Sequence, residues 1–204
     1  MRLSGNKLSA VRGGRTLFAD LAFSVDGGTA LLVTGPNGVG KTTLLRSIAG
    51  LMRPAAGGIV LEGGAADQPV SEQCHYVGHL SAIKAGLSIE ENARFWSGFL
   101  GGERGRIDAA LQTFGLDALR DIPAGYLSAG QKRRLGLARL LLAERPVWLL
   151  DEPTTSLDTA AQNILTGVVN KHLAAGGLTV AATHMALGFA NARELKLGAG
   201  RKPA

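Results

Sequence analysis

The stretch "GPNGVGKTT" at 35–43 combines glycines, a lysine and hydroxyl groups at a spacing suited to holding phosphate. Gly35, Gly40, Lys41 and Thr42 meet the pattern G-x-x-x-x-G-K-[ST], and the stretch follows an apolar run and precedes a helical pattern. Glycines let successive backbone N–H groups turn inward around an anion, and the start of a helix adds positive potential. We therefore predict a phosphate-binding loop in which Lys41 reaches the β- and γ-phosphates and Thr42 ligates magnesium.

Two adjacent carboxylates, Asp151 and Glu152, follow the apolar run "VWLL". A carboxylate at the end of a buried strand beside a phosphate loop can bind magnesium directly or through water, and we assign this role to Asp151. Glu152 can then face the terminal phosphate and take a proton from the attacking water, as a general base. Taken alone, the two acids would be an ordinary strand end, but the upstream loop favours the catalytic interpretation.

A second anion seat is indicated by "LSAGQ" at 127–131, where Ser128 and Gly130 stand at the start of a helical pattern. Backbone N–H groups at a helix start bind anions, and a serine there also caps the helix. Both interpretations hold together, because Ser128 can cap the helix while the backbone presents N–H groups to a phosphate. The sequence therefore raises the question of why one small chain carries two phosphate sites.

The elements that position these residues alternate between strand and helix patterns. Residues 1–34 predict two antiparallel strands followed by a buried strand, and 41–50 predict a helix that stops at Gly50. Ser88 and Glu91 stand in capping-box register, and residues 84–126 are expected to be mostly helical. Further strands are predicted in "GGIVLEGG", "CHYVGHL", "VWLLDEP" and "LTVAATH", with a helix in "TAAQNILTGVVNKHLAA" and an edge strand in "ARELKLGAG". This alternation favours an α/β fold with a mostly parallel central sheet.

Composition narrows the class of protein. With 204 residues, 46% of them hydrophobic and 19% charged, the chain can bury a substantial core. Its apolar runs are too short for a membrane span and its start lacks a secretory pattern, so we expect a cytosolic protein. A single cysteine, Cys74, excludes an intramolecular disulfide. The net charge of +6 is compatible with nucleic acid or an anionic membrane surface, but the tight basic cluster at 131–139 lacks interleaved aromatics and favours a solvated helix face.

With these motifs in place, the chain resembles the ATPase subunits of ABC transporters from about residue 3 to 197. The resemblance implies a P-loop NTPase fold with an antiparallel β subdomain and a small helical lobe, and the cofactors ATP and Mg²⁺. It also answers the question of two phosphate sites: two such domains pack head to tail as a homodimer, and each ATP lies between one P-loop and the partner's signature. The implied ATP-binding residues are Arg12, Gly35, Pro36, Asn37, Gly38, Val39, Gly40, Lys41, Thr42 and Thr43, with Thr42 and Asp151 on the metal. The implied signature residues are Leu127, Ser128, Ala129, Gly130 and Gln131.

Other features of that family fall in order along the chain. Asp158 in "TTSLD" resembles the D-loop at the dimer seam, and His184 matches the histidine that contacts the γ-phosphate. Two positions depart from the common pattern. Arg12 stands where many relatives stack adenine on an aromatic ring, and an arginine plane can stack in its place. His79 stands where relatives usually carry a glutamine that senses magnesium and water, and its imidazole would make this coupling sensitive to pH.

The short chain and the stretch "IKAGLSIEENARFW" resemble one branch of the family, the haem-exporter ATPases of bacterial cytochrome c maturation. This implies a peripheral subunit on the cytoplasmic face of the bacterial inner membrane, working with the B, C and D membrane components, without nucleic acid. Hydrolysis would power haem export or the release of haem-loaded chaperone. We expect one ABC ATPase domain over 1–204, with the core and β subdomain at about 1–78 and 127–204 and the helical lobe at about 79–126.

Three alternatives remain open. The ATPase of another ABC exporter, for drug, lipid or lipoprotein, would have the same core and differ in its membrane partner. A chromosome or repair ATPase would separate the P-loop from the signature by a long coiled coil, for which this chain has no room. A translation factor acting on the ribosome usually carries two sets of these motifs, and one set occurs here.

Overall fold

The computed structural model describes residues 1–198. The last two residues of the expected edge strand, Ala199 and Gly200, and the tail at 201–204 lie outside the described part. The chain divides into two compact units. The first comprises Met1–Tyr76, Arg145–Glu152 and the described part of Val169–Ala204, and the second comprises Val77–Glu144 and Pro153–Val168.

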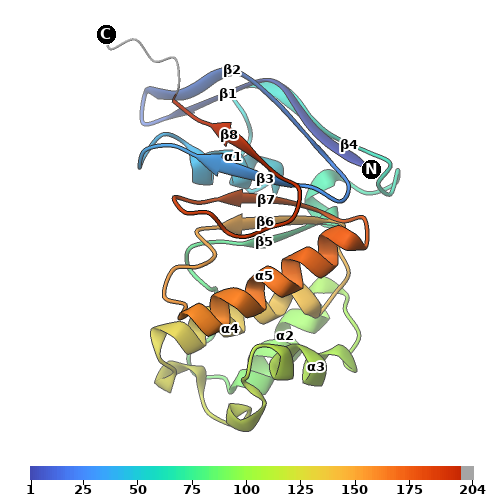
Figure 1. Cartoon of the computed structure of the whole chain (residues 1–204), viewed down its shortest axis with the longest axis vertical. Helices are drawn as coiled ribbons and strands as arrows, with labels where there is room; N and C mark the ends of the chain where they lie inside the picture. The colour runs from blue at the N-terminus through green and yellow to red at the C-terminus, as the bar shows by residue number, and fades with distance from the viewer. Residues whose placement is uncertain (199–204) are drawn as a thin grey trace. The chain divides into compact units, whose positions relative to one another are not determined.

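The first unit contains two sheets, which Figure 1 shows as separate layers. The antiparallel sheet has the order β2-β1-β4, formed by β1 (Arg2–Arg12), β2 (Arg15–Asp26) and β4 (Ala56–Glu62). The other sheet has the order β5-β6-β7-β3-β8, and the pairs β6/β7, β7/β3 and β3/β8 are parallel. Its strands are β3 (Ala30–Thr34), β5 (Cys74–Val77), β6 (Val147–Asp151), β7 (Leu178–Ala182) and β8 (Ala192–Lys196). The predicted mostly parallel sheet and antiparallel strands are confirmed.

The two sheets share one hydrophobic core with α1 (Lys41–Ile48). Leu3 and Leu8 come from the antiparallel sheet, while Leu44 and Leu45 come from α1, and all four are fully buried. Every residue of β6 and β7 is buried, which explains their continuously apolar sequences, since a parallel strand covered on both faces has no solvent side. Asp151 ends β6 and Thr183 follows β7, so the carboxyl ends of both strands place buried polar residues at the edge of this core.

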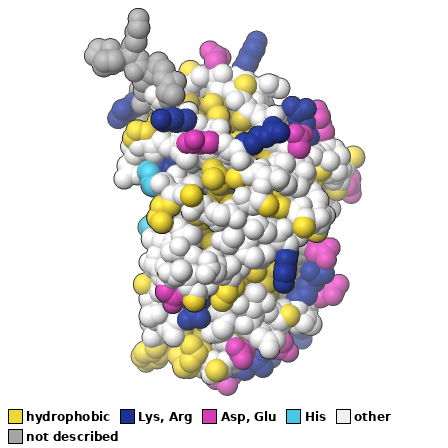
Figure 2. All heavy atoms as spheres, viewed as in Figure 1, with side chains coloured by type: hydrophobic (Ala, Val, Ile, Leu, Met, Phe, Trp, Pro, Cys, Tyr) yellow, Lys and Arg dark blue, Asp and Glu magenta, His cyan; other side chains and the backbone are white. Residues whose placement is uncertain are grey.

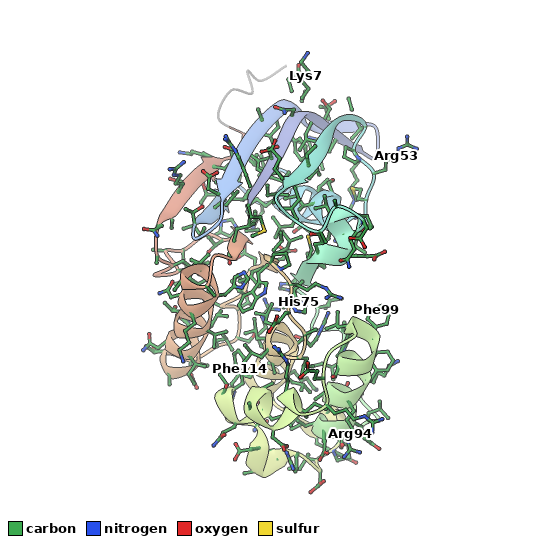
Figure 3. The ribbon with its side chains drawn as sticks, turned by 90° about the vertical axis from the view of Figure 1, so that its right-hand side faces the viewer. Lys7, Arg53, His75, Arg94, Phe99 and Phe114 are labelled. Carbon is green, nitrogen blue, oxygen red and sulfur yellow. The ribbon has the colours of Figure 1, made fainter. Side chains whose placement is uncertain are left out.

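A stacked aromatic pair lies within the same unit. The Trp148 ring of β6 lies parallel to the His172 ring at a centroid distance of 3.9 Å, and His172 Nε2 lies 3.2 Å from the Leu178 carbonyl oxygen. Burial lowers the pKa of His172, because the charged imidazolium loses more hydration than the neutral ring. The histidine therefore acts here as a packed aromatic group. His75, which is also buried, is labelled in Figure 3, where Lys7 and Arg53 point outward from the same unit.

The second unit is mainly helical. It contains α2 (Ile89–Leu100), α3 (Arg106–Thr113) and α4 (Ala129–Ala138), which pack against one another, and α5 (Thr159–Ala174) as far as Val168. Phe114 is fully buried among these helices, while Phe99 and Arg94 project from α2 (Figure 3). Ser88 and Glu91 form the predicted capping box at the start of α2.

Trp96 of α2 is fixed by two contacts within the second unit. Its Nε1 donates to the carbonyl oxygen of Ala82 at 3.2 Å, and the Arg139 guanidinium carbon lies 3.6 Å from the centre of the ring. Burial lowers the pKa of Arg139 to about 10. None of the helices in the part of the chain that the structure describes is long and apolar enough to cross a membrane.

Candidate functional site

The predicted phosphate loop joins the end of β3 to the start of α1, where the sequence pattern places it. Gly35 adopts a φ of 134°, and a Cβ there would lie 2.5 Å from the Leu197 carbonyl oxygen, so only glycine fits. Gly38 has a φ of 76° and nothing within 4 Å of its ideal Cβ position. The loop therefore turns through two glycines at positive φ just before the start of α1, where backbone N–H groups can bind an anion.

Lys41 is the positive charge at this loop and is only 7% exposed. Its Nζ donates to the carbonyl oxygens of Gly35 at 2.8 Å and Pro36 at 3.4 Å. The same nitrogen lies 2.9 Å from Nε2 of His184. The ammonium group is therefore held over the loop, where it can meet a phosphate oxygen.

Thr42 and Asp151 come together although they are 109 positions apart, with Thr42 Oγ1 donating to Asp151 Oδ1 at 3.1 Å. Asp151 is buried at the end of β6, and Thr42 lies in the first turn of α1. A hydroxyl and a carboxylate supply the hard oxygen ligands that Mg²⁺ prefers. The residues present therefore fit a magnesium ion shared with bound phosphates.

Two residues that no sequence motif indicated, Tyr76 and Arg46, support Asp151 through a chain of hydrogen bonds. Tyr76 donates its hydroxyl to Asp151 Oδ2 at 3.4 Å and accepts from Arg46 Nε at 3.4 Å. Burial is the main cause that raises the pKa of Tyr76, so its hydroxyl stays protonated and able to donate. The hydrogen bond to Tyr76 raises the pKa of Arg46 in turn. These residues orient Asp151, and only the adjacency of β5 and β6 reveals them.

Glu152 and His184 also meet in the first unit. Glu152 Oε1 lies 3.3 Å from His184 Nε2, and Asn37 Oδ1 lies 2.9 Å from the same nitrogen. An ammonium only donates, so a neutral His184 accepts at Nε2 from Lys41, whereas a protonated ring donates to Asn37 and Glu152. His184 thus stands between the cation of the loop and the predicted base, and its partners depend on its proton.

The predicted signature residues lie in the second unit, where α4 begins with a capping box. Ser128 Oγ accepts from the backbone of Gln131 at 3.2 Å, and Gln131 Oε1 accepts from the backbone of Ser128 at 2.8 Å. The first backbone amides of α4, on Ala129 and Gly130, point out of the helix start by helix geometry. The cap therefore fixes the helix start whose amides the proposed trans phosphate contact needs.

The predicted D-loop packs on this helix start. A Cβ on Gly130 would lie 2.9 Å from the carbonyl oxygen of Ser156, which adopts a left-handed φ of 65°. Asp158 Oδ1 accepts from the backbone of Ala161 at 2.7 Å and so caps α5. The predicted signature and the predicted D-loop thus approach each other closely at Gly130 and Ser156 within the second unit, and a side chain larger than that of glycine at position 130 would disturb this contact.

Two further predicted residues, His79 and Arg12, lie on the surface, whereas Val39, Thr43 and Leu127 are buried. His79 is exposed just after β5, and Arg12 is exposed at the end of β1, paired with Arg15 across the hairpin. In the first unit the structure brings together Asn37, Lys41, Thr42, Asp151, Glu152 and His184. This group combines a glycine-rich loop with its lysine, oxygen atoms of the kind that bind magnesium and a carboxylate beside a histidine, an arrangement that can hydrolyse a phosphoanhydride.

Comparison with known proteins identifies the family to which this chain is similar. Residues 18–155 match the model of the family described as ABC transporter. The chain is 56% identical over 198 residues to the cytochrome c biogenesis ATP-binding export protein CcmA of Bradyrhizobium diazoefficiens, covering 97% of this chain and 98% of that protein. It is 54% identical to the protein of the same name from Rhodopseudomonas palustris, covering 98% of this chain and 99% of that protein.

Solved structures agree on the fold. The structure of an ATP-binding subunit of an ABC transporter matches with a TM-score of 0.80 at 28% identity, covering 90% of this chain and 80% of that chain. An ABC transporter ATP-binding protein from Pyrococcus furiosus matches with a TM-score of 0.82 at 22% identity, covering 97% and 98%.

Proposed function

This chain belongs to the ABC transporter family, and we propose that it hydrolyses ATP as the nucleotide-binding subunit of an export complex that serves cytochrome c biogenesis. The observation that carries the chemistry is the convergence of Lys41, Glu152 and His184 at the phosphate loop. The assignment to cytochrome c biogenesis is supported by the relatives, which are named cytochrome c biogenesis ATP-binding export proteins and match over nearly their whole length.

The residues of the first unit divide the work of hydrolysis. Backbone amides of the loop and Lys41 bind the β- and γ-phosphates of ATP, and this charge stabilises the transition state. Glu152 takes a proton from a water whose oxygen attacks the γ-phosphorus, and the bond from that phosphorus to the ADP oxygen breaks. His184 contacts the γ-phosphate oxygens as they move. Thr42 and Asp151 would hold a magnesium ion, which neutralises charge on the phosphates.

We further propose that two copies form a head-to-tail homodimer, in which Ser128 and the Gly130 backbone of one copy complete the ATP site of the other. The capped start of α4 supports this assignment, because it presents backbone amides in a fixed direction. Asp158 would lie at the dimer seam, His79 would link the nucleotide to the second unit, and Arg12 would contact adenine. Each of these roles depends on assembly or on bound ATP.

The complex would sit on the cytoplasmic face of the inner membrane with the B, C and D components of the maturation system. Its proposed work is to power haem export or the release of haem-loaded chaperone. A nucleic-acid partner is disfavoured on the face drawn in Figure 2, where Lys and Arg side chains are interspersed with Asp and Glu.

A chromosomal replacement tests the cargo. A cell whose only copy carries Glu152→Gln should lose covalently bound haem from its c-type cytochromes, while its b-type cytochromes remain. Replacement of exposed Lys7 by Gln in the same way is the control and should leave both classes unchanged. Unchanged c-type cytochromes with Glu152→Gln would contradict the proposed cargo and leave an exporter of another substrate, to be identified by its co-purifying membrane partner.

A further inference from the structure

Arg133 is a buried cation in the middle of α4, the helix that begins with the signature. Its exposure is 4%, whereas its neighbours Lys132 and Arg134 are partly exposed. Burying a guanidinium is unfavourable unless its donors are satisfied, so a solvated helix face does not account for this position. The basic cluster at 131–139 therefore contains one arginine with a different role from its neighbours.

The donors of Arg133 reach two backbone segments of the second unit. One Nη atom donates to the carbonyl oxygen of Gly78 at 2.7 Å, and Nε donates to the carbonyl oxygen of Pro153 at 3.1 Å. Gly78 directly precedes His79, and Pro153 directly follows Glu152. One planar side chain thus holds the residues adjacent to two predicted catalytic groups, and it does so from the signature helix.

Glu152 needs such support because its backbone is strained. Its φ is 48°, in the left-handed region that residues with a Cβ rarely adopt. On its amino side, the backbone N–H of Glu152 donates to the Ala182 carbonyl oxygen of β7 at 2.9 Å. On its carboxyl side, Arg133 Nε donates to the carbonyl oxygen of Pro153, the residue that follows Glu152.

We propose that Arg133 is a positioning residue that sets the direction of the Glu152 carboxylate and ties it to the signature helix and to the segment of His79. The link gives a physical route by which engagement of the signature by ATP reaches the base. The inference rests on the proposed role of Glu152 as the base that activates water. Hydrolysis is sensitive to such positioning, because a displacement of about 1 Å can lower a rate about 100-fold.

The test uses the full chain purified together with its membrane partners. Arg133→Met removes the donors at similar length, and Arg133→Lys keeps the charge but offers a compact ammonium group in place of the planar fork. Arg134→Gln is the matched control, because Arg134 lies next to Arg133 on α4 and donates to the Phe114 carbonyl oxygen at 2.9 Å. For each variant we would measure kcat and KM for ATP, the Kd of a fluorescent ATP analogue and the thermal unfolding midpoint.

We expect Arg133→Met to lower kcat by about 10- to 100-fold with KM and Kd within about twofold of the wild type. Arg133→Lys should recover part of kcat, and Arg134→Gln should retain it. A variant that merely loosens the fold would lower the unfolding midpoint without this separation of kcat from KM.

A double variant tests whether the effect passes through Glu152. In single-turnover assays, Arg133→Met should add little to the loss caused by Glu152→Gln, because both changes remove the same function. Wild-type kcat in Arg133→Met, or in Arg133→Lys if the methionine variant does not fold, would overturn the proposal. The proposal would also be overturned if Arg133→Met lowered the single-turnover rate by the same factor in the wild type and in Glu152→Gln. The haem assay of the chromosomal Glu152→Gln variant does not involve Arg133. A wrong cargo assignment is therefore distinguishable from a wrong role for Arg133.

Discussion

The Nζ of Lys41 lies 2.9 Å from Nε2 of His184, although 143 positions separate the two residues in the chain. The contact exists because β3 and β7 are neighbours in the parallel sheet, so the loop after one strand meets the residues that follow the other. The carboxyl ends of such strands are where α/β proteins bind ligands. The order of the strands therefore creates the site, because it brings together residues that are distant in the sequence.

Replacing Lys41 by Ala should weaken ATP binding. Charge-assisted hydrogen bonds of an ammonium contribute about 1.5–3 kcal/mol, so the Kd of a fluorescent ATP analogue should rise roughly 10- to 150-fold. Lys7→Ala, at an exposed site on β1, should leave the Kd unchanged. Wild-type affinity in Lys41→Ala would refute the assignment of the phosphate loop.

Glu152→Gln should separate binding from hydrolysis. Loss of the proposed general base should lower kcat by about 10²–10⁴-fold, whereas the proposed phosphate-binding loop is unchanged. ATP should then accumulate on the protein, and gel filtration with ATP should show a dimer. If the variant hydrolyses ATP at the wild-type rate, Glu152 is not the base. If it elutes as a monomer at all ATP concentrations, the isolated chain does not form the head-to-tail homodimer.

The two capping boxes provide a matched pair of variants. Ser128→Ala and Ser88→Ala each remove a side-chain cap that accepts from the third residue of its helix, so each should lower the free energy of unfolding by about 1 kcal/mol. Only Ser128→Ala should also lower the ATPase rate, because the proposed phosphate contact with the partner's ATP lies at the start of α4. Denaturation curves measure the stability of each variant, and ATPase assays measure its rate. Equal ATPase rates in the two variants would argue against a phosphate contact at Ser128.

Two glycines should respond to alanine in opposite directions. A Cβ on Gly177 would lie 2.2 Å from the His172 ring, so Gly177→Ala should destabilise the fold by about 1–3 kcal/mol. Gly167 in α5 has nothing within 4 Å of its ideal Cβ position, so Gly167→Ala should stabilise the fold by about 0.5–1 kcal/mol. Urea denaturation measures both, and the same sign for both would contradict the packing described.

His172 should make stability depend on pH. Burial lowers its pKa in the folded chain, so below the ordinary value of about 6.5 the unfolded chain binds this proton first. The free energy of unfolding should therefore fall as the pH drops from 7.5 towards the lowered folded-state pKa. His172→Phe keeps an aromatic ring on Trp148 and should lose less stability over that range. Identical pH dependence in both proteins would contradict this.

Much of the fold follows from local patterns in the sequence. The capping pair Ser88 and Glu91 was predicted because its spacing is a property of a single helix turn. The buried strands β6 and β7 were predicted because continuous apolar runs can be recognised without knowing their neighbours. The sequence also placed the loop at 35–43 between a strand and a helix, as the structure has it.

Long-range partners could not be predicted in this way. Tyr76 and Arg46 support Asp151 only because β5 and β6 are adjacent, and strand order is not encoded in any local pattern. Arg133 lies in a run of basic residues that resembles a solvated face, and only the packing of α4 shows which of them is buried. The left-handed φ of Glu152 was equally hidden, because glutamate has no local preference for that conformation.

The stacking of Trp148 on His172 gives the chain an optical property of its own. The chain has two tryptophans, and Trp148 belongs to the first unit while Trp96 belongs to the second. One ring lies against an imidazole and the other against a guanidinium, so their emission should differ in intensity and wavelength. A Trp→Phe change at either position would leave one emitter, and the response of each unit to nucleotide could be recorded separately without an attached dye.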